Sequence, residues 1–361
     1  LSVSQKRNIT LLLGICIGLC TICKIHGVFL WLGAGLYIIF FNRKWLSYSW
    51  LYVAAFITMI IISPILIWNI QNDFIMYRFQ GARVDTSQSL HYDHVLTEIV
   101  GEFFYNNLFN VVMIIVALFA FIRKKNFLSK QKSYWILFSA LPIIFIFWIF
   151  SLRGNTLPHW SGPGYMTLLL LAAAYWSDKC PMQIPFLIKA SLTFILILLI
   201  SGVLTVHYYP GTLGNKEETH LGDGDFTLDM YGWKQLAPVM DSIYQKDLAM
   251  GKMHPDAFLT ANKWFPAAHI DYYVAKPLKW PFYAIGDLTD IHHYKWLNEQ
   301  RKYDPAGKDA YAIVPSNMFY NAATIYKNNF LYIDTASIIP QYRSGIMVRK
   351  FYVIRLHQYK P

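Results

Sequence analysis

Charged side chains are scarce in this sequence: they make up 15% of its 361 residues, against about 25% in an ordinary soluble domain. Hydrophobic residues make up 55%, and the mean hydropathy is +0.31. This composition argues against an ordinary soluble domain and indicates a membrane protein. The formal net charge is +11, but the basic residues lie between apolar runs. That arrangement favours loops between membrane spans over a nucleic-acid partner.

Cysteine is also scarce, with four in the chain. Cys16, Cys20 and Cys23 lie at helical spacing in an apolar run, where they are expected to act as small packing residues. The stretch "CTIC" has the Cys-x-x-Cys spacing of a redox or zinc site, but no second ligand pair or strand–helix context accompanies it. Cys180 is alone, so no disulfide framework is predicted.

Several sequence patterns are missing. There is no internal repeat, no low-complexity tract and no cleavable signal-peptide pattern, and the first residue is Leu1. We therefore expect a fragment whose beginning is missing. The C-terminal part carries no nucleophile elbow, phosphate loop or dinucleotide fingerprint, which predicts an accessory role for that part. Its tryptophans could stack on sugar rings, although packing in the core is the expected use; they are Trp233, Trp264, Trp280 and Trp296.

Seven apolar segments approach the length of about 17–25 residues that crosses a bilayer. They are about 8–23, 27–42, 50–69, 103–122, 134–151, 160–177 and 186–208. Only "KIHG" separates the first two, which predicts a tight helical hairpin, and the fifth contains Pro142, which membrane helices tolerate. Lysines and arginines concentrate in alternate loops. The positive-inside rule then places the chain after Tyr209 outside the cytoplasm.

Residues 209–361 have a different pattern, with Gly/Asp turns, charges and short alternating runs. Strand-like runs occur at "AFLTA", "PFYAIG", "DAYAIVP" and "GIMVRKFYVIRLH", and helix-like stretches lie between them. The stretch "GDGDFTLD" is expected to form a turn and a helix cap. The predicted fold is therefore an α-helical polytopic membrane protein of about seven transmembrane helices over residues 1–208. A small extracytoplasmic α/β domain over residues 209–361 comes after it.

The segment 62–84, "ISPILIWNIQNDFIMYRFQGARV", starts as a membrane helix and ends with two arginines. Trp68 fits an interfacial anchor, and the polar residues from Asn69 to Asp73 fit a helix end or turn. A polar outer loop of about 33 residues is expected next, and loops of that length are often functional. Its acidic residues and histidines could bind a metal or pair with the arginines; they are His91, Asp93, His94, Glu98 and Glu102. The spacing of "HYDH" alone does not establish a metal site.

The same segment resembles bacterial members of the dolichyl-phosphate-mannose protein mannosyltransferase superfamily, which includes the lipid A aminoarabinose transferase. "GICIGLCTICKIHGVFLWLGAGLYIIF" resembles that family's helix pair joined at a lysine, here Lys24. "LPHWSGPGYMTLLLLAAAYW" resembles its P-x-W-x-x-P-x-Y helix start, and "DFTLDMYGWKQL" resembles the start of its small outer domain. The matches extend from about Ile9 to Leu236.

The resemblance implies a polytopic glycosyltransferase of the bacterial inner membrane. Such an enzyme transfers a sugar from a polyprenyl-phosphate donor, at the outer face, to a glycolipid or protein acceptor. The family's catalytic acid lies in its first outer loop. No segment here matches that loop, so the catalytic residue is expected upstream of Leu1. No cofactor is assigned, and a divalent cation could assist departure of the phosphate.

Outer cations are the expected ligands of the donor phosphate, since Arg and Lys bind phosphate with charge-assisted hydrogen bonds. They are Lys24, Arg78, Arg83 and Arg153. Further candidate substrate-binding residues are Asp73, Gln80, His159 and Trp160.

Two other functions are open at this point. One is a transporter or flippase of a lipid-linked saccharide, and the other is a non-catalytic membrane subunit with an outer binding domain.

Overall fold

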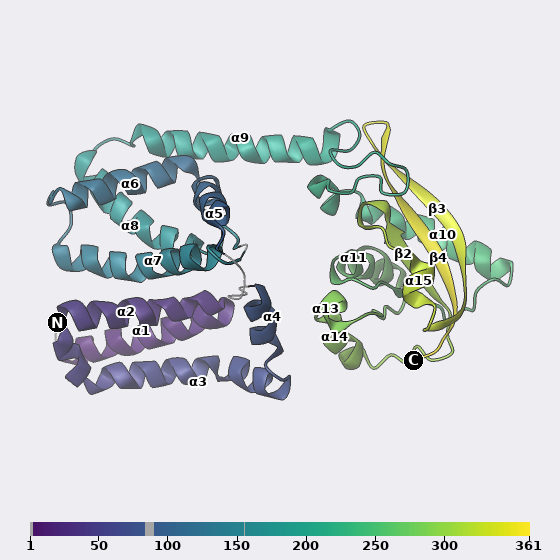
Figure 1. Cartoon of the computed structure of the whole chain (residues 1–361), viewed down its shortest axis with the longest axis horizontal. Helices are drawn as coiled ribbons and strands as arrows, with labels where there is room; N and C mark the ends of the chain where they lie inside the picture. Colours follow the sequence, from purple (N-terminus) through teal and green to yellow (C-terminus); the bar gives the residue numbers. More distant parts are fainter. Residues whose placement is uncertain (1–2, 84–89, 155) are drawn as a thin grey trace. The chain divides into compact units, whose positions relative to one another are not determined.

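The computed structural model describes residues 3–83, 90–154 and 156–361. The chain forms two compact units, Leu1–Ile197 and Leu198–Pro361, and the boundary falls inside helix α9. The first unit is helical (Figure 1). Its elements are α1 (Val3–Cys23), η1 (Ile25–Val28), α2 (Phe29–Phe41), η2 (Arg43–Ser47), α3 (Ser49–Gln71), α4 (Ile75–Arg83), α5 (Tyr92–Tyr105), α6 (Leu108–Ile122), α7 (Lys130–Ser151), α8 (Gly162–Lys179) and α9 (Phe186–Tyr208).

Small residues let the helices of the first unit approach closely. α1 packs along α3, α2 along α7, and α8 against both α6 and α7. A Cβ atom at Gly14 would clash with the carbonyl oxygen of Ala54, so only glycine fits at that crossing. The Thr58 hydroxyl donates to the carbonyl oxygen of Gly14 at 2.7 Å. Close backbone contact with an interhelical hydrogen bond is the usual packing of helices in membranes.

Among the described residues, four helices have the length and apolar composition to cross a membrane: α1, α3, α7 and α9. The bent pair α5–α6 would make a fifth if it counts as one span. α2 is shorter, with 13 residues. The apolar helices are therefore present, but the predicted number of seven spans is not confirmed. The predicted helical hairpin joined by "KIHG" is present as α1, η1 and α2, and Pro142 lies inside α7 as predicted.

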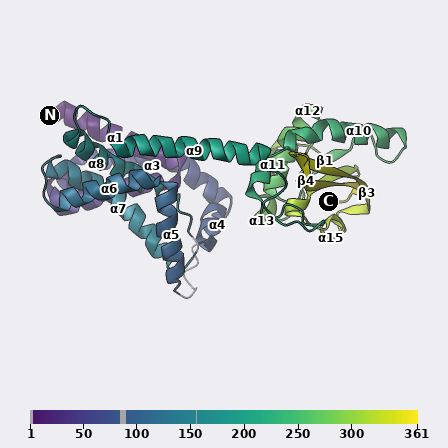
Figure 2. The same ribbon diagram turned by 90° about the horizontal axis from the view of Figure 1, so that it is seen from above.

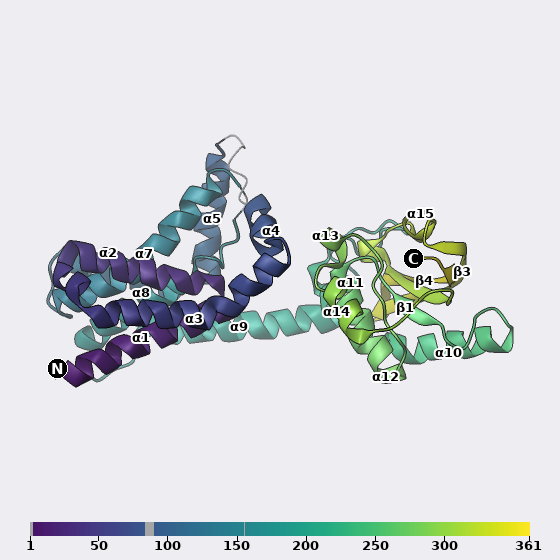
Figure 3. The same cartoon turned by 90° about the horizontal axis from the view of Figure 1, so that it is seen from below.

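Two predictions between residues 72 and 122 were wrong. The segment 103–122 is not one helix, because the chain breaks between Tyr105 and Leu108 and turns by 103°; Figure 2 shows α5 and α6 running in different directions. Asn107 takes a positive φ of 64° at the turn, and its side chain accepts a hydrogen bond from Phe109 N. The region expected to be a long outer loop contains two helices, α4 and α5 (Figure 3). α5 escaped detection because its apolar residues are interrupted by two glutamates.

The second unit is an α/β domain around a four-stranded sheet, as predicted. The strands are β1 (Phe258–Thr260), β2 (Ala310–Pro315), β3 (Phe330–Arg343) and β4 (Ile346–Tyr359), in the order β1-β2-β4-β3. β1 pairs parallel with β2, and the other pairs are antiparallel. Helical segments surround the sheet: η3 (Phe226–Asp229), η4 (Trp233–Gln235), α10 (Leu236–Ala249), α11 (Trp264–Ile270), η5 (Asp271–Ala275), α12 (Lys276–Leu278), α13 (Leu288–Ile291), α14 (Tyr294–Arg301), η6 (Ser316–Met318) and α15 (Ala322–Tyr326).

The sheet carries a core on each face. Tyr311 and Ile313 of β2 pack with α10 and α11 on one side, whereas Ala310, Ala312 and Val314 pack on the other side with Tyr326 of α15. This alternation arises from the two-residue period of a strand. Figure 2 shows α10 and α15 on opposite sides of the sheet. β2 is therefore buried on both faces, which explains its continuous apolar sequence.

Strand β3 was not predicted. It pairs with β4 as an edge strand, and its register shifts at two places. Its residues do not alternate regularly between buried and exposed, and it contains Pro340, which disfavours a central strand. Proline is tolerated in β3 because β3 lies at the edge of the sheet.

The prediction for "GDGDFTLD" is confirmed in part, because Asp225 caps η3 by accepting a hydrogen bond from Thr227 N at 2.9 Å. Trp233 is buried in the core, as expected, whereas Trp264 is exposed.

Candidate functional site

Three basic side chains from distant parts of the sequence meet at one end of the helical unit. Lys24 and His26 lie in the connection between α1 and α2, and His159 lies just before α8. The imidazoles of His26 and His159 interact electrostatically with each other and with the Lys24 ammonium group. Partial burial, reinforced by the charge of Lys24, lowers the pKa of His159. The lowered pKa keeps the His159 imidazole neutral near pH 7, so the Lys24 ammonium group supplies the positive charge that an anion placed here would meet.

Aromatic rings form one wall of this site. The ring of Phe147 lies 5.3 Å from that of His26 and 5.6 Å from that of Trp160. The Tyr105 ring lies 5.4 Å from the His159 ring. These contacts join the α1–α2 turn, the end of α7 and the end of α5. They place both His159 and Trp160, predicted as substrate-binding residues, beside Lys24.

Glu102 of α5 is fully buried next to this wall. Its Oε2 accepts hydrogen bonds from Trp148 Nε1 at 2.8 Å and from the Tyr165 hydroxyl at 3.0 Å. Its other oxygen, Oε1, completes no hydrogen bond among the described residues, although the Ser161 hydroxyl lies against the carboxylate. A buried carboxylate oxygen without a partner is costly, and such groups occur where the site has a use for them.

Glu98 lies one turn before Glu102 on the same face of α5 and is also buried. Neither of its carboxylate oxygens completes a hydrogen bond among the described residues, although Thr156 lies against it. The prediction that Glu98 and Glu102 pair with arginines is not borne out within the described ranges. Both were expected on an open loop, whereas helix α5 directs them into the packed interior.

The segment between α7 and α8 packs against α5. Pro158 lies so close to Gly101 that a Cβ atom there would clash with the proline ring. His91 N, at the start of α5, donates to Leu152 O at 2.8 Å. Arg153, a predicted phosphate ligand, comes directly after Leu152 and is exposed. These contacts hold the segment that carries Arg153 and His159 against the helix that carries both glutamates.

The remaining predicted residues lie at the end of α3 and in α4. α3 ends at Gln71, as the polar stretch predicted, and Asp73 and Phe74 turn the chain with positive φ angles of 52° and 55°. Arg78 is an exposed residue of α4. Gln80 and Arg83 belong to α4, but their side chains lie outside the described part of the structure. No contact between α4 and the Lys24 site is established.

The second unit contains a cavity of about 760 Å³ beside α13 and α14. Its lining includes Tyr283, Tyr303 and Lys295, together with Asn262, whose Oδ1 is buried without a hydrogen-bond partner among the described residues. Volumes of this size are typical of small-molecule sites. The sequence analysis assigned no site in this domain, because no motif marks the residues that meet there.

Comparisons with protein-family models, with curated proteins and with solved structures found no match to this chain. Its function is therefore inferred from the arrangement of its side chains. Of the predicted site residues, the structure brings together Lys24, His159 and Trp160. The sequence analysis missed His26 and the burial of both glutamates. The spacing His94, Glu98, Glu102, at every fourth residue, would have predicted one helical face had a helix been expected there.

Proposed function

We propose that this protein is an integral membrane glycosyltransferase. It would move a sugar from a polyprenyl-phosphate donor to a glycolipid or protein acceptor at the outer face of the membrane. The observation that carries the proposal is that Lys24 and His159 meet beside an aromatic wall at one end of an apolar helical unit. Glu102 is buried against Trp148, the residue next to Phe147 of that wall. The resemblance expected from the sequence motifs is part of the same proposal.

The chemistry of sugar transfer fits this set of side chains. A polyprenyl phosphate keeps its lipid in the bilayer and its charged head at the interface, where an ammonium group at a helix end can reach it. Positive charge stabilises the departing phosphate, and a carboxylate can accept the acceptor's proton. Lys24 would bind the phosphate head and stabilise its departure. Glu98 and Glu102 of α5 are the buried carboxylates that could accept the proton.

A second candidate function is transport of a lipid-linked saccharide. One observation favours it: α5 and α6 are apolar enough together to form one span but bend by 103°. Transporters often bind their substrates at such discontinuous helices. The buried Glu98 and Glu102 on the first half of the pair would then line a path rather than serve in catalysis.

The test is transfer of a radiolabelled sugar from a synthetic polyprenyl-phosphate donor by the complete protein in detergent. Lys24→Ala should lower kcat by about 10²–10³-fold, the usual cost of removing one group that stabilises developing negative charge. Lys44→Ala is the matched control, because Lys44 lies in η2 at the far end of α2. Its activity should equal that of the unaltered protein.

Three outcomes would decide between the candidates. Loss of transfer in folded Lys24→Ala, with Lys44→Ala active, supports the proposal. Full activity of Lys24→Ala contradicts the assignment of the site. No transfer by the complete protein, combined with movement of the labelled lipid-linked sugar across reconstituted vesicles, would overturn the enzyme in favour of the transporter.

A further inference from the structure

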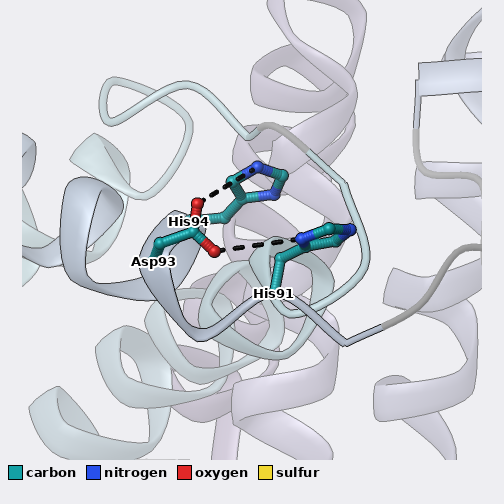
Figure 4. A group of neighbouring side chains, drawn as sticks. All are labelled: His91, Asp93 and His94. Carbon is teal, nitrogen blue, oxygen red and sulfur yellow. Dashed lines mark ion pairs between the residues drawn. The ribbon is translucent and has the colours of Figure 1, made fainter.

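His91, Asp93 and His94 gather at the beginning of α5. One ligand atom from each residue lies within 4.8 Å of the other two. Figure 4 shows the Asp93 carboxylate beside the two imidazole rings, with one oxygen directed to each ring. His91 Nδ1 lies 3.9 Å from Asp93 Oδ1, and His94 Nε2 lies 3.9 Å from Asp93 Oδ2. Among the described residues, no other group of three metal-binding side chains comes this close.

The backbone explains how three neighbouring residues can face one point. His91 precedes the helix with an extended backbone (φ −120°, ψ 96°), whereas Asp93 and His94 belong to its first turn. The change from extended to helical chain brings the His91 ring back over the His94 ring, and the two stack with their centres 4.7 Å apart. The hydrogen bond from His91 N to Leu152 O fixes this bend.

Capping of α5 does not account for the cluster. Residues that cap helices accept a hydrogen bond from the first turn, and the His91 side chain makes no such bond. Asp93 does favour the positive end of the helix dipole, but that effect needs neither histidine. The nitrogen of His94 that faces Asp93 is Nε2, so the helix start leaves one nitrogen from each imidazole directed at the same carboxylate.

We propose that His91, Asp93 and His94 bind a divalent transition-metal cation, with Zn²⁺ the first to test. Imidazole nitrogen and carboxylate oxygen are ordinary zinc ligands at about 2.0–2.2 Å, so tetrahedral ligand atoms lie roughly 3.3 Å apart. The two histidine–aspartate separations of 3.9 Å, each to a different carboxylate oxygen, exceed this by well under 1 Å. All three ligand atoms lie within 4.8 Å of one another. Rotation of the Asp93 side chain, which is 77% exposed, together with rotation of the 39% exposed His91 side chain, would bring them to ligand distance.

Three protein ligands leave the fourth tetrahedral position open. A water molecule or an anionic oxygen can occupy it. The ion would also tie the start of α5 to the segment after α7 that carries Arg153, since His91 already contacts Leu152. This proposal does not depend on the proposed glycosyltransferase activity, because metal binding can be measured without any sugar substrate.

The experiment titrates Zn²⁺ into the chelator-treated protein in detergent, against a chromophoric competitor. We expect one Zn²⁺ per chain at this site. His91→Ala and His94→Ala should each weaken binding by more than about 100-fold, since loss of a ligand exceeds the 10–100-fold cost of losing a supporting hydrogen bond. Asp93→Asn, which keeps the side-chain size, should weaken it in the same direction. His254→Ala removes an exposed histidine of the second unit and should change nothing.

A second measurement avoids the substitutions altogether. Co²⁺ added to the unaltered protein should give the visible d–d absorption of a nitrogen- and oxygen-ligated ion, and Zn²⁺ should remove it. The proposal is overturned if all variants retain zinc binding equal to that of His254→Ala, or if the unaltered protein binds no Zn²⁺ and gives no cobalt spectrum.

Discussion

The substitution Asp247→Asn tests how the second unit is held together. Asp247 of α10 is buried and receives two hydrogen bonds from Arg355 of β4, at 2.7 Å and 2.8 Å. The Tyr311 hydroxyl of β2 donates to the same carboxylate at 2.8 Å. Asparagine keeps the volume of the side chain but removes its charge and one acceptor. Arg355 would then retain only Asp334, at 2.6 Å, as an ionic partner among the described residues.

The size of the effect can be worked out from these contacts. Removing one partner of a buried ion pair costs about 3–5 kcal/mol of unfolding free energy. Because Asp334 still compensates part of the Arg355 charge, the lower end, about 3 kcal/mol, is expected. Tyr311→Phe removes a single hydrogen bond to a charged group, which costs about 1.5–3 kcal/mol. Glu218→Gln removes a solvent-exposed ion pair with Lys350 and should have no measurable effect.

Hydrogen exchange of the whole protein in detergent, read by mass spectrometry on peptides of β2 and β4, measures these changes in opening free energy. The expected order of destabilisation is Asp247→Asn, then Tyr311→Phe, then Glu218→Gln. If Asp247→Asn exchanges like Glu218→Gln, the pair does not hold α10 to the sheet. If Tyr311→Phe is the most harmful, the hydroxyl rather than the ion pair carries the contact.

Three further predictions concern other contacts. Burial, together with the charge of Arg349, lowers the pKa of His269 to about 4. An unfolded histidine titrates near 6.5. The second unit should therefore lose stability as the pH falls from about 6.5 towards 4, because the unfolded chain takes up the proton first. His269→Phe should abolish that loss in hydrogen exchange at pH 7 and pH 5, and an unchanged pH dependence would contradict the assignment. Gly14→Ile should separate α1 from α3 and lower the melting temperature in detergent. Gly35→Ile is the control, because a Cβ atom at Gly35 would meet nothing within 4 Å. Equal melting temperatures of the two variants would refute the close crossing of α1 and α3. Tyr165→Phe should lower the stability of the helical unit by about 1 kcal/mol or more, and unchanged unfolding in denaturant would show that the bond to Glu102 contributes nothing.

The sequence predicted the elements whose composition is uniform. Long apolar runs gave α3, α7 and α9 with nearly correct bounds, and short strand-like runs gave β2 and β4. Elements of mixed composition were missed. α5 combines apolar residues with Glu98 and Glu102, and Glu102 is buried against donors supplied by α7 and α8. β3 is an edge strand whose pairing with β4 comes from the sheet and not from its own period.

The candidate site also combines residues that could be selected from the sequence with contacts that could not be predicted from it. Lys24, His159 and Trp160 could be selected from the sequence, because each lies where an apolar run meets a polar turn. Their meeting could not be predicted, since it depends on α2 packing along α7 and on the aromatic contact of Phe147 with both His26 and Trp160. The buried Arg343 and Arg349 of the second unit present the opposite case. Arginines are seldom fully buried unless they are paired, and Arg343 is enclosed by Asp225, Thr227 and the carbonyl oxygen of Gly211.

Buried charged groups differ between the two units in how completely they are partnered. In the second unit, the guanidinium groups of Arg343, Arg349 and Arg355 each donate several hydrogen bonds, as a stable core requires. In the helical unit, both carboxylate oxygens of Glu98 and Oε1 of Glu102 complete no hydrogen bond among the described residues. Incomplete partnering of buried carboxylates is costly to a fold, and its concentration on one face of one helix is what a site that uses those carboxylates on a substrate would require.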